Sequence, residues 1–151
     1  MKIISGGQTG VDRAGLDAAL EKGIECGGWC PEGGEAEDGA IPDKYPIKVL
    51  PGAGYGQRTK RNVLDSDGTI IIYFSYATGG TELTINFCIK EHKPYVLIDA
   101  NEISIDRAAQ KILEFVKDKN VLNIAGPRAG GEPRAYDYAK SVMILVLESV
   151  K

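Results

Sequence analysis

The sequence predicts a single α/β domain built on a doubly wound, mainly parallel sheet with helices on both faces. Three observations support this prediction. Strand-like segments alternate with helical segments along the 151 residues, as they do in βαβ units. The central strand segments are apolar throughout, which is typical of strands buried on both faces. The length suits one domain over residues 1–151, and 43% hydrophobic residues are enough for a core. Right-handed crossovers then favour a Rossmann-like strand order.

The first elements are predicted from short apolar segments and the residues that end them. Lys2–Ser5 is a short strand that runs directly into glycines. A helix extends from Thr9, a residue type that favours helix N-termini, to about Lys22, and Gly23 ends it. Ile24–Trp29 is expected to be a second strand, although its glycines weaken it.

Residues 31–46 are expected to be irregular, because they are rich in glycine, proline and acidic residues. Loops of this length inside a compact domain are usually functional or disordered. A brief strand at Ile47–Leu50 and a helix at Gly56–Asp65, polar on most faces, are expected to follow.

The second half of the chain has the clearest strand, Thr69–Phe74, which is continuous and rich in β-branched residues. The remaining predicted elements are helices at Thr81–Glu91 and Ser104–Asp118, strands at Tyr95–Ile98 and Val121–Ile124, and a final helix opened by Pro133 that buries Ala139, Val142, Met143 and Val146.

Three glycine-containing loops, Ser5–Gly10, Thr78–Glu82 and Ala125–Arg128, connect predicted strands to predicted helix N-termini. Free backbone N–H groups and the positive end of the helix dipole favour an anion there, and glycine lets the anion approach closely. We expect the first strand and Thr69–Phe74 to be neighbours, which would place the first two loops side by side. The alternative is that the glycines only form tight turns. The loop residues expected to bind a phosphate-containing ligand are Gly6, Gly7, Gln8, Thr9, Gly10, Gly79, Gly80, Thr81, Gly126 and Pro127.

Arginines are expected in or near the first turns of several helices, where a cation is unfavourable by about 0.3–1 kcal/mol. This placement favours an anionic ligand among them, and the guanidinium fork suits phosphate. The alternative is a set of solvated arginines offset by Asp12 and Glu132. The arginines are Arg13, Arg58, Arg128 and Arg134, of which the first three are expected to contact ligand, and Thr59 and Asn62 are expected to add polar contacts.

Two acids, Asp12 and Glu82, are placed to act as a general acid or base or to accept a hydrogen bond from ligand. The single histidine, His92, is expected to face solvent. No directly bound metal is predicted. Cys26 and Cys30 are read as structural thiols, because their spacing matches neither a redox motif nor a zinc ribbon. The acidic residues of the 31–46 segment, which are expected to be solvated although a cation site or a gate is an alternative, are Glu32, Glu35, Glu37 and Asp38.

Composition and charge exclude several classes of protein. A net charge of −3 argues against bulk binding of nucleic acid or anionic membranes. The segment before Ser5 is too short for a secretory signal, and the longest apolar runs are far shorter than a membrane-spanning helix. An odd number of cysteines, three, does not fit a secreted disulfide framework. We therefore expect a cytoplasmic protein without a membrane segment.

The sequence closely resembles the molybdenum cofactor carrier family along essentially its whole length. The stretches that carry the resemblance are Ser5–Arg13, Gly28–Pro31, Ala36–Gly39 with Ile41-Pro42, Arg58-Thr59 with Asn62-Val63 and Asp65–Asp67, Gly79–Thr81, and Leu122-Asn123 with Ala125–Arg128. The resemblance implies a Rossmann-like fold and a homo-oligomer, either a dimer or a tetramer. It also implies a pocket for the molybdenum cofactor (molybdopterin) or another phosphorylated, nucleotide-like ligand. The family is similar to a wider group that includes lysine decarboxylase-like phosphoribohydrolases.

Two departures from the family pattern concern the loops. The family commonly has a basic residue where this chain has Glu32-Gly33-Gly34-Glu35, and often has Glu-Ser where Ala129-Gly130 follows Arg128. The phosphoribohydrolases carry Pro-Gly-Gly-x-Gly-Thr-x-x-Glu, whereas here Glu82 directly follows Thr81. This difference counts against the same hydrolytic chemistry, because the acid would project from another part of the helix.

The leading hypothesis is a binding protein that shelters a phosphorylated pterin-type cofactor. The first alternative is an enzyme that hydrolyses the N-glycosidic bond of a nucleoside 5′-monophosphate with Glu82 or Asp12. The second alternative is a nucleotide-sensing module that acts through a partner.

Overall fold

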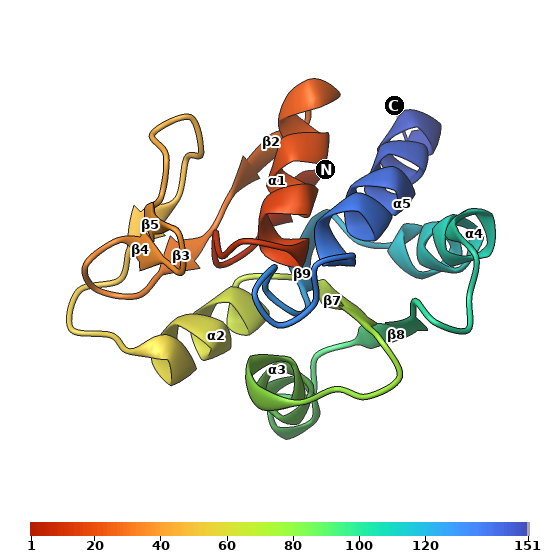
Figure 1. Ribbon diagram of the computed structural model, residues 1–151. Helices are drawn as coiled ribbons and strands as arrows, with labels where there is room; N and C mark the ends of the chain where they lie inside the picture. The colour runs from red at the N-terminus through yellow and green to blue at the C-terminus, as the bar shows by residue number, and fades with distance from the viewer. Residues whose placement is uncertain (151) are drawn as a thin grey trace.

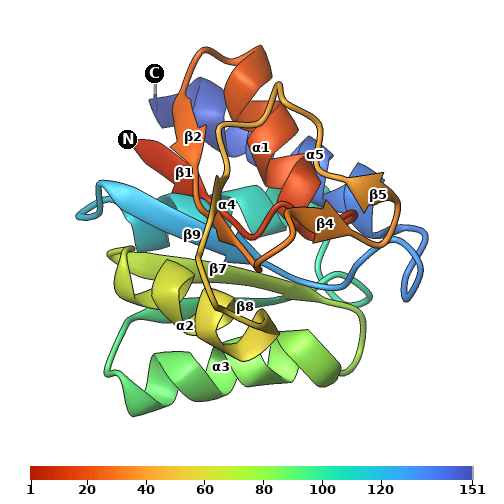
Figure 2. The ribbon, with the colours of Figure 1, turned by 90° about the vertical axis from the view of Figure 1, so that its left-hand side faces the viewer.

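A computed structural model, which describes residues 1–150, shows one parallel sheet between two layers of helices (Figure 2). This arrangement confirms the predicted doubly wound α/β fold. One face of the sheet is covered by α1 (Val11–Glu21), α4 (Ile105–Val116) and α5 (Ala135–Val150), and the other by α2 (Tyr55–Leu64) and α3 (Gly79–Lys90).

The main sheet has five parallel strands in the order β2-β1-β9-β7-β8. The strands are β1 (Lys2–Ile4), β2 (Glu25–Gly27), β7 (Gly68–Tyr73), β8 (Tyr95–Asp99) and β9 (Val121–Ala125). The expectation that the first strand and Thr69–Phe74 are neighbours is wrong. The last strand of the chain, β9, enters the centre of the sheet and pairs with β1 on one side and β7 on the other.

The strand order becomes regular when the C-terminal unit β9–α5 is counted first. The sheet then reads 3-2-1-4-5, which is the Rossmann order. Figure 1 shows the two chain termini at the same end of the molecule, as such a rearrangement requires. The strand order therefore reverses between β9 and β7, so that the crevice where ligands bind in this fold lies beyond the carboxyl ends of these two strands.

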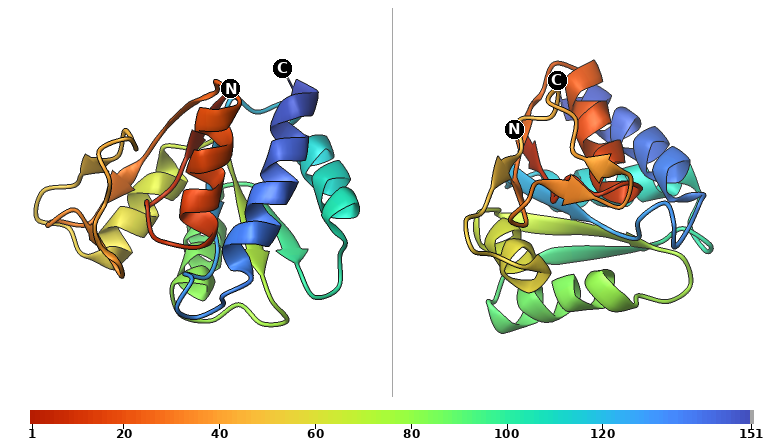
Figure 3. Two further views of the ribbon diagram at one scale, coloured as in Figure 1. Left: turned by 45° about the horizontal axis from the view of Figure 1, so that its top comes forward. Right: turned by 60° about the vertical axis from the view of Figure 1, so that its left-hand side comes forward.

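The segment between β2 and α2 contains more structure than predicted. The expected strand Ile24–Trp29 is divided at Gly28, whose φ of 128° suits glycine. Two further short pairs follow, namely β3 (Trp29–Cys30) with β6 (Lys48–Val49) and the hairpin of β4 (Glu35–Ala36) with β5 (Gly39–Ala40). Figure 3 shows this segment beside the sheet, with the hairpin near the first turn of α1.

The core follows the alternation of side chains along β7. Ile70 and Ile72 pack into the layer of α1, α4 and α5, whereas Ile71 packs with Val63 and Cys88 under α2 and α3. The final helix buries the four residues predicted for it, Ala139, Val142, Met143 and Val146. Among residues 1–150, no helix is both long enough and apolar enough to cross a bilayer.

Candidate functional site

The loops that follow β1 and β9 lie side by side at the carboxyl edge of the sheet. The amide of Val11 donates to the carbonyl of Pro127 at 3.2 Å, and the amide of Ala129 donates to the Thr9 hydroxyl at 3.2 Å. Gly10 is required here, because a Cβ would lie 2.3 Å from the Pro127 carbonyl oxygen. The first and third glycine loops of the sequence thus form one surface.

The second glycine loop is placed differently from the prediction. It opens α3 beyond β7, so that the strand β9 separates it from the loop after β1. Because neighbouring strands are about 4.8 Å apart, β1 and β7 lie about 10 Å from each other across the sheet. Gly79 and Gly80 are exposed, and a Cβ at either would meet no atom within 4 Å, so the start of α3 is open to a ligand. Thr81 is buried and Glu82 is exposed in the same first turn.

The Asp12 carboxylate sits against the loop after β1. It accepts a hydrogen bond from the Gln8 amide at 3.3 Å, while the Ser5 hydroxyl, which accepts from the Gly7 amide at 3.3 Å, donates to the Asp12 carbonyl. Burial raises the pKa of Asp12 to about 6, although the Arg58 guanidinium and the Gln8 amide act in the opposite direction. Asp12 is therefore an enclosed carboxyl that titrates near neutral pH, as acid–base groups do.

Arg58 reaches this loop from α2. Its guanidinium covers Gly6 so closely that a Cβ there would lie 1.7 Å from Nη1. Nη1 is 3.6 Å from the Asp12 carboxylate, and the Tyr55 ring lies 5.4 Å from the guanidinium carbon. The Nε atom is enclosed and has no hydrogen-bond partner. One donor of the Arg58 guanidinium is therefore unpaired beside the loop after β1.

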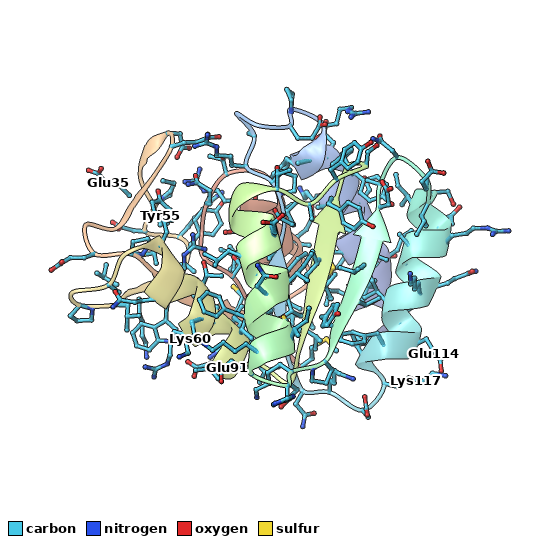
Figure 4. The ribbon with its side chains drawn as sticks, turned by 90° about the horizontal axis from the view of Figure 1, so that it is seen from below. Glu35, Tyr55, Lys60, Glu91, Glu114 and Lys117 are labelled. Atoms are coloured by element: carbon cyan, nitrogen blue, oxygen red, sulfur yellow. The ribbon has the colours of Figure 1, made fainter. Side chains whose placement is uncertain are left out.

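The two other residues predicted on α2 are buried. Asn62 has a structural role. Its Nδ2 donates to the Trp29 carbonyl and its Oδ1 accepts from the Trp29 amide, both at 3.0 Å. These bonds fix β3 to α2. Thr59 is 8% exposed. Near the middle of α2, the ion pair of Lys60 with Glu91 joins this helix to α3 at 3.5 Å (Figure 4).

The acidic segment, which the sequence indicated to be solvated, is bound to the site instead. Arg13 forms a two-pronged ion pair with Asp38 at 2.5 and 2.8 Å and donates from Nε to the Gly7 carbonyl. Glu37 accepts from the Thr9 hydroxyl and from the Gly130 amide at 2.8 Å. These hydrogen bonds lower the pKa of both carboxyls, with Arg13 as the main cause for Asp38 and Thr9 for Glu37.

Arg128 and Arg134 have different surroundings. Arg128 lies 3.5 Å from the Glu37 carboxylate and is 61% exposed. Arg134 is paired with Glu132 at 2.8 Å, as the alternative interpretation of the arginines proposed, and its guanidinium stacks over the Phe74 ring at 4.7 Å. The arginine cluster at the paired loops therefore consists of Arg13, Arg58 and Arg128.

Other candidate groups lie outside the site. His92 is exposed at the end of α3, and Cys26, Cys30 and Cys88 are buried free thiols. Within the described part of the chain, no three His, Cys, Asp or Glu side chains gather in an arrangement able to hold a metal ion. Two surface clefts, of about 490 and 500 Å³, lie beside Trp29 at β1 and β2 and between α4 and α5, and no residue of the three glycine loops lines either of them.

Sequence reasoning missed the roles of Glu37, Asp38 and Gly130. The signal that points to the two acids is their position as an adjacent acidic pair, Glu37-Asp38, between glycines in a chain that has several arginines near helix starts. Composition alone made that segment look solvated. Only the fold brings residues 9, 37 and 130 together.

Comparisons with known proteins agree with this topology. The family described as "Circularly permutated YpsA SLOG family" matches residues 3–147. A solved structure from Syntrophus aciditrophicus SB, named a "putative molybdenum carrier protein", shares 46% sequence identity, covers 97% of this chain and 94% of its own, and superposes with a TM-score of 0.92. A search of curated proteins finds no match.

Proposed function

The chain belongs to the circularly permutated YpsA SLOG family, and on that basis we propose that it binds a phosphorylated, pterin- or nucleotide-like small molecule. The molybdenum cofactor is the first candidate, because the structure that is 46% identical bears the name "putative molybdenum carrier protein". The proposed position is the carboxyl edge of the sheet, around the loops that follow β1 and β9.

The observation that carries this proposal is the convergence of anion-binding donors from three elements. Arg13 comes from α1, Arg58 from α2 and Arg128 from the loop after β9. The Thr9 hydroxyl and the Gly130 amide belong to the loops after β1 and β9, and both already bind the Glu37 carboxylate. Guanidinium, hydroxyl and amide groups are the donors that hold phosphate in proteins.

The donor set fits the phosphate of the proposed ligand. Nitrogen and hydroxyl donors at the two loops would hold one phosphate. The open first turn of α3 supplies further N–H groups about 10 Å away across the sheet. This spacing suits a ligand with a body longer than a single phosphate group. The protein's share of the work is to bind, orient and shelter that ligand.

Equilibrium dialysis of the purified protein tests the proposal, with the molybdenum cofactor, AMP, FMN and inorganic phosphate as ligands. We expect binding of at least one phosphorylated compound, and at least tenfold weaker binding by Arg128→Gln or Arg58→Gln. Arg107→Gln is the matched control, because Arg107 is exposed on α4. No binding by any of these ligands, or equal losses in all three variants, would contradict the proposal. Sedimentation of the same samples tests the expected dimer or tetramer.

A second candidate function is supported by Asp12. An enclosed carboxyl with a pKa near 6 beside Arg58 is suited to general acid–base chemistry. It would serve hydrolysis of the N-glycosidic bond of a nucleoside monophosphate. Incubation with a panel of monophosphates distinguishes the two. Base release that is abolished in Asp12→Asn supports the enzyme, whereas bound but unchanged nucleotide supports the carrier.

A further inference from the structure

A short hairpin of the chain places two carboxylates where the proposed ligand would bind its anionic group. Residues 35–40 form two-residue strands β4 and β5, joined by a two-residue turn, Glu37-Asp38. The turn lies over the loop that follows β1. The backbone amide of Glu37 donates to the Gln8 side chain at 2.9 Å, which aligns the hairpin with that loop.

The surroundings of the Glu37 carboxylate are those of a bound anion. It receives a hydroxyl hydrogen bond from Thr9 and an amide hydrogen bond from Gly130, and the Arg128 Nε atom lies 3.5 Å away. These three donors come from two different loops, neither of which is adjacent to Glu37 in sequence. A phosphate oxygen makes the same contacts with the same donors.

The Asp38 carboxylate likewise occupies an anion-binding position, at Arg13. Its two oxygens accept from the two terminal nitrogens of Arg13, in the fork geometry that guanidinium offers to carboxylate and phosphate alike. The Arg13 side chain is only 11% exposed, whereas that of Asp38 is 49% exposed. The cation therefore belongs to the body of the protein, and the carboxylate approaches it from outside.

Apart from these contacts, the hairpin has little to hold it in place. Its strands are two residues long, and a hairpin of that size is marginally stable by itself. Gly33 and Gly34, with φ of 100° and 63°, precede it and give the chain rotational freedom. Beyond it, Tyr45 is anchored to Asp17 by a hydrogen bond of 2.6 Å. Ile41, directly after the hairpin, packs against the core, and its amide donates to the Gly34 carbonyl at 3.0 Å. Gly34 and Ile41 therefore mark the two ends of the segment that would move, residues 35–40.

We propose that residues 35–40 are an internal competitor, in which Glu37 and Asp38 occupy the anion-binding positions until the phosphate of the ligand displaces them. This inference rests on the proposed function, since it assumes a phosphorylated ligand at these loops. Binding then opens the hairpin, and re-docking of the two carboxylates promotes release. A protein that must both take up and hand over its ligand gains reversibility from such competition.

The experiment is an amide NMR titration of the full chain with inorganic phosphate, combined with hydrogen exchange of residues 35–40. Glu37→Gln keeps the size of the side chain but removes its charge, so phosphate should bind this variant about tenfold more tightly than the wild type. Glu35→Gln is the matched control, because Glu35 lies at the outer edge of the molecule, on the same hairpin (Figure 4). It should bind phosphate as the wild type does.

Hydrogen exchange gives the second readout. Residues 35–40 should exchange faster when phosphate is bound to the wild type, and faster in Glu37→Gln without phosphate. Phosphate that binds at Thr9 and Gly130 while the hairpin stays protected, or that binds Glu37→Gln no more tightly than the wild type, overturns the competitor and leaves the proposed function standing. Absence of phosphate binding in both proteins overturns the competitor too, and also counts against the proposed function.

Discussion

The Arg58 guanidinium lies 3.6 Å from the Asp12 carboxylate, although the two residues belong to helices on opposite faces of the sheet. The pair meets at the carboxyl edge of β1, where Gly6 leaves room for the arginine. Both side chains are largely enclosed, with 13% and 8% of their surface exposed. The first loop of the chain thus connects the two helical layers through charged groups.

Replacing Asp12 by Asn should change how stability depends on pH. Burial raises the pKa of Asp12 from 3.8 to about 6, so the stabilisation that comes from its protonation is complete below about pH 3.8 and is lost as the pH rises through 6. Asn does not titrate. The unfolding free energy of Asp12→Asn relative to the wild type should therefore rise by about 2.5 kcal/mol between pH 4 and pH 8. Urea unfolding at both pH values measures this, and a difference that is independent of pH would contradict the assigned burial.

Two glycine substitutions should separate stability from binding. In Gly10→Ala the new Cβ meets the Pro127 carbonyl oxygen at 2.3 Å in backbone with φ of 82°, so we expect a loss of about 2–4 kcal/mol. In Gly6→Ala the Cβ meets the end of the Arg58 side chain, which can rotate away. The loss should be about 1 kcal/mol or less, with weaker ligand binding. Thermal unfolding compares the two, and equal losses would be inconsistent with this packing.

The partly buried acid Asp17 should stabilise the fold through two tyrosines. Its oxygens accept hydrogen bonds from the hydroxyls of Tyr45 at 2.6 Å and Tyr136 at 2.5 Å. Each Tyr→Phe change removes one such bond to a charged group, so we expect a loss of about 1.5–3 kcal/mol in unfolding free energy. Tyr45→Phe should additionally speed hydrogen exchange over residues 42–47, whereas Tyr136→Phe should not. Unchanged stability in both variants would exclude this anchor.

The three thiols should be unreactive in the folded protein. Cys26, Cys30 and Cys88 are buried, and burial raises the pKa of each, so little thiolate forms at pH 8. Reaction with a disulfide reagent should be slow in buffer and complete for all three after unfolding in urea. Rapid reaction of any one of them in buffer would show that its surroundings are open.

Local sequence patterns predicted most of the fold. The β-branched run of β7 and the amphipathic pattern of α4 identify strand and helix through short-range chemistry. The strand order was mispredicted, because the strand that begins at Val121 has nothing in its own sequence that assigns it to the middle of the sheet. Pairing of distant strands depends on the whole chain. In this permuted topology the last strand takes the position that the Rossmann order gives to the first.

The site was predicted only in part, because local patterns again identified the loops but not the contacts between distant residues. Glycines before helices indicated which loops reach the sheet edge, and the paired loops do contain Thr9 and Arg128. Asp38, the partner of Arg13, is 25 residues away in sequence, and Glu37, the partner of Arg128, is further still from that arginine. Both acids belong to the hairpin of β4 and β5. Charge pairing over such separations follows from tertiary structure, so the sequence alone could not distinguish a solvated acid from a docked one.

An amide NMR titration with AMP, repeated on the Arg128→Gln and Arg107→Gln variants, addresses the proposed site most directly. If the loops after β1 and β9 bind phosphate, the largest shifts should fall on Thr9, Arg13 and Gly130. Arg128→Gln should then weaken binding at least tenfold, and Arg107→Gln should leave it unchanged. Shifts centred instead on the cleft beside Trp29, with equal affinity in both variants, would contradict the assignment.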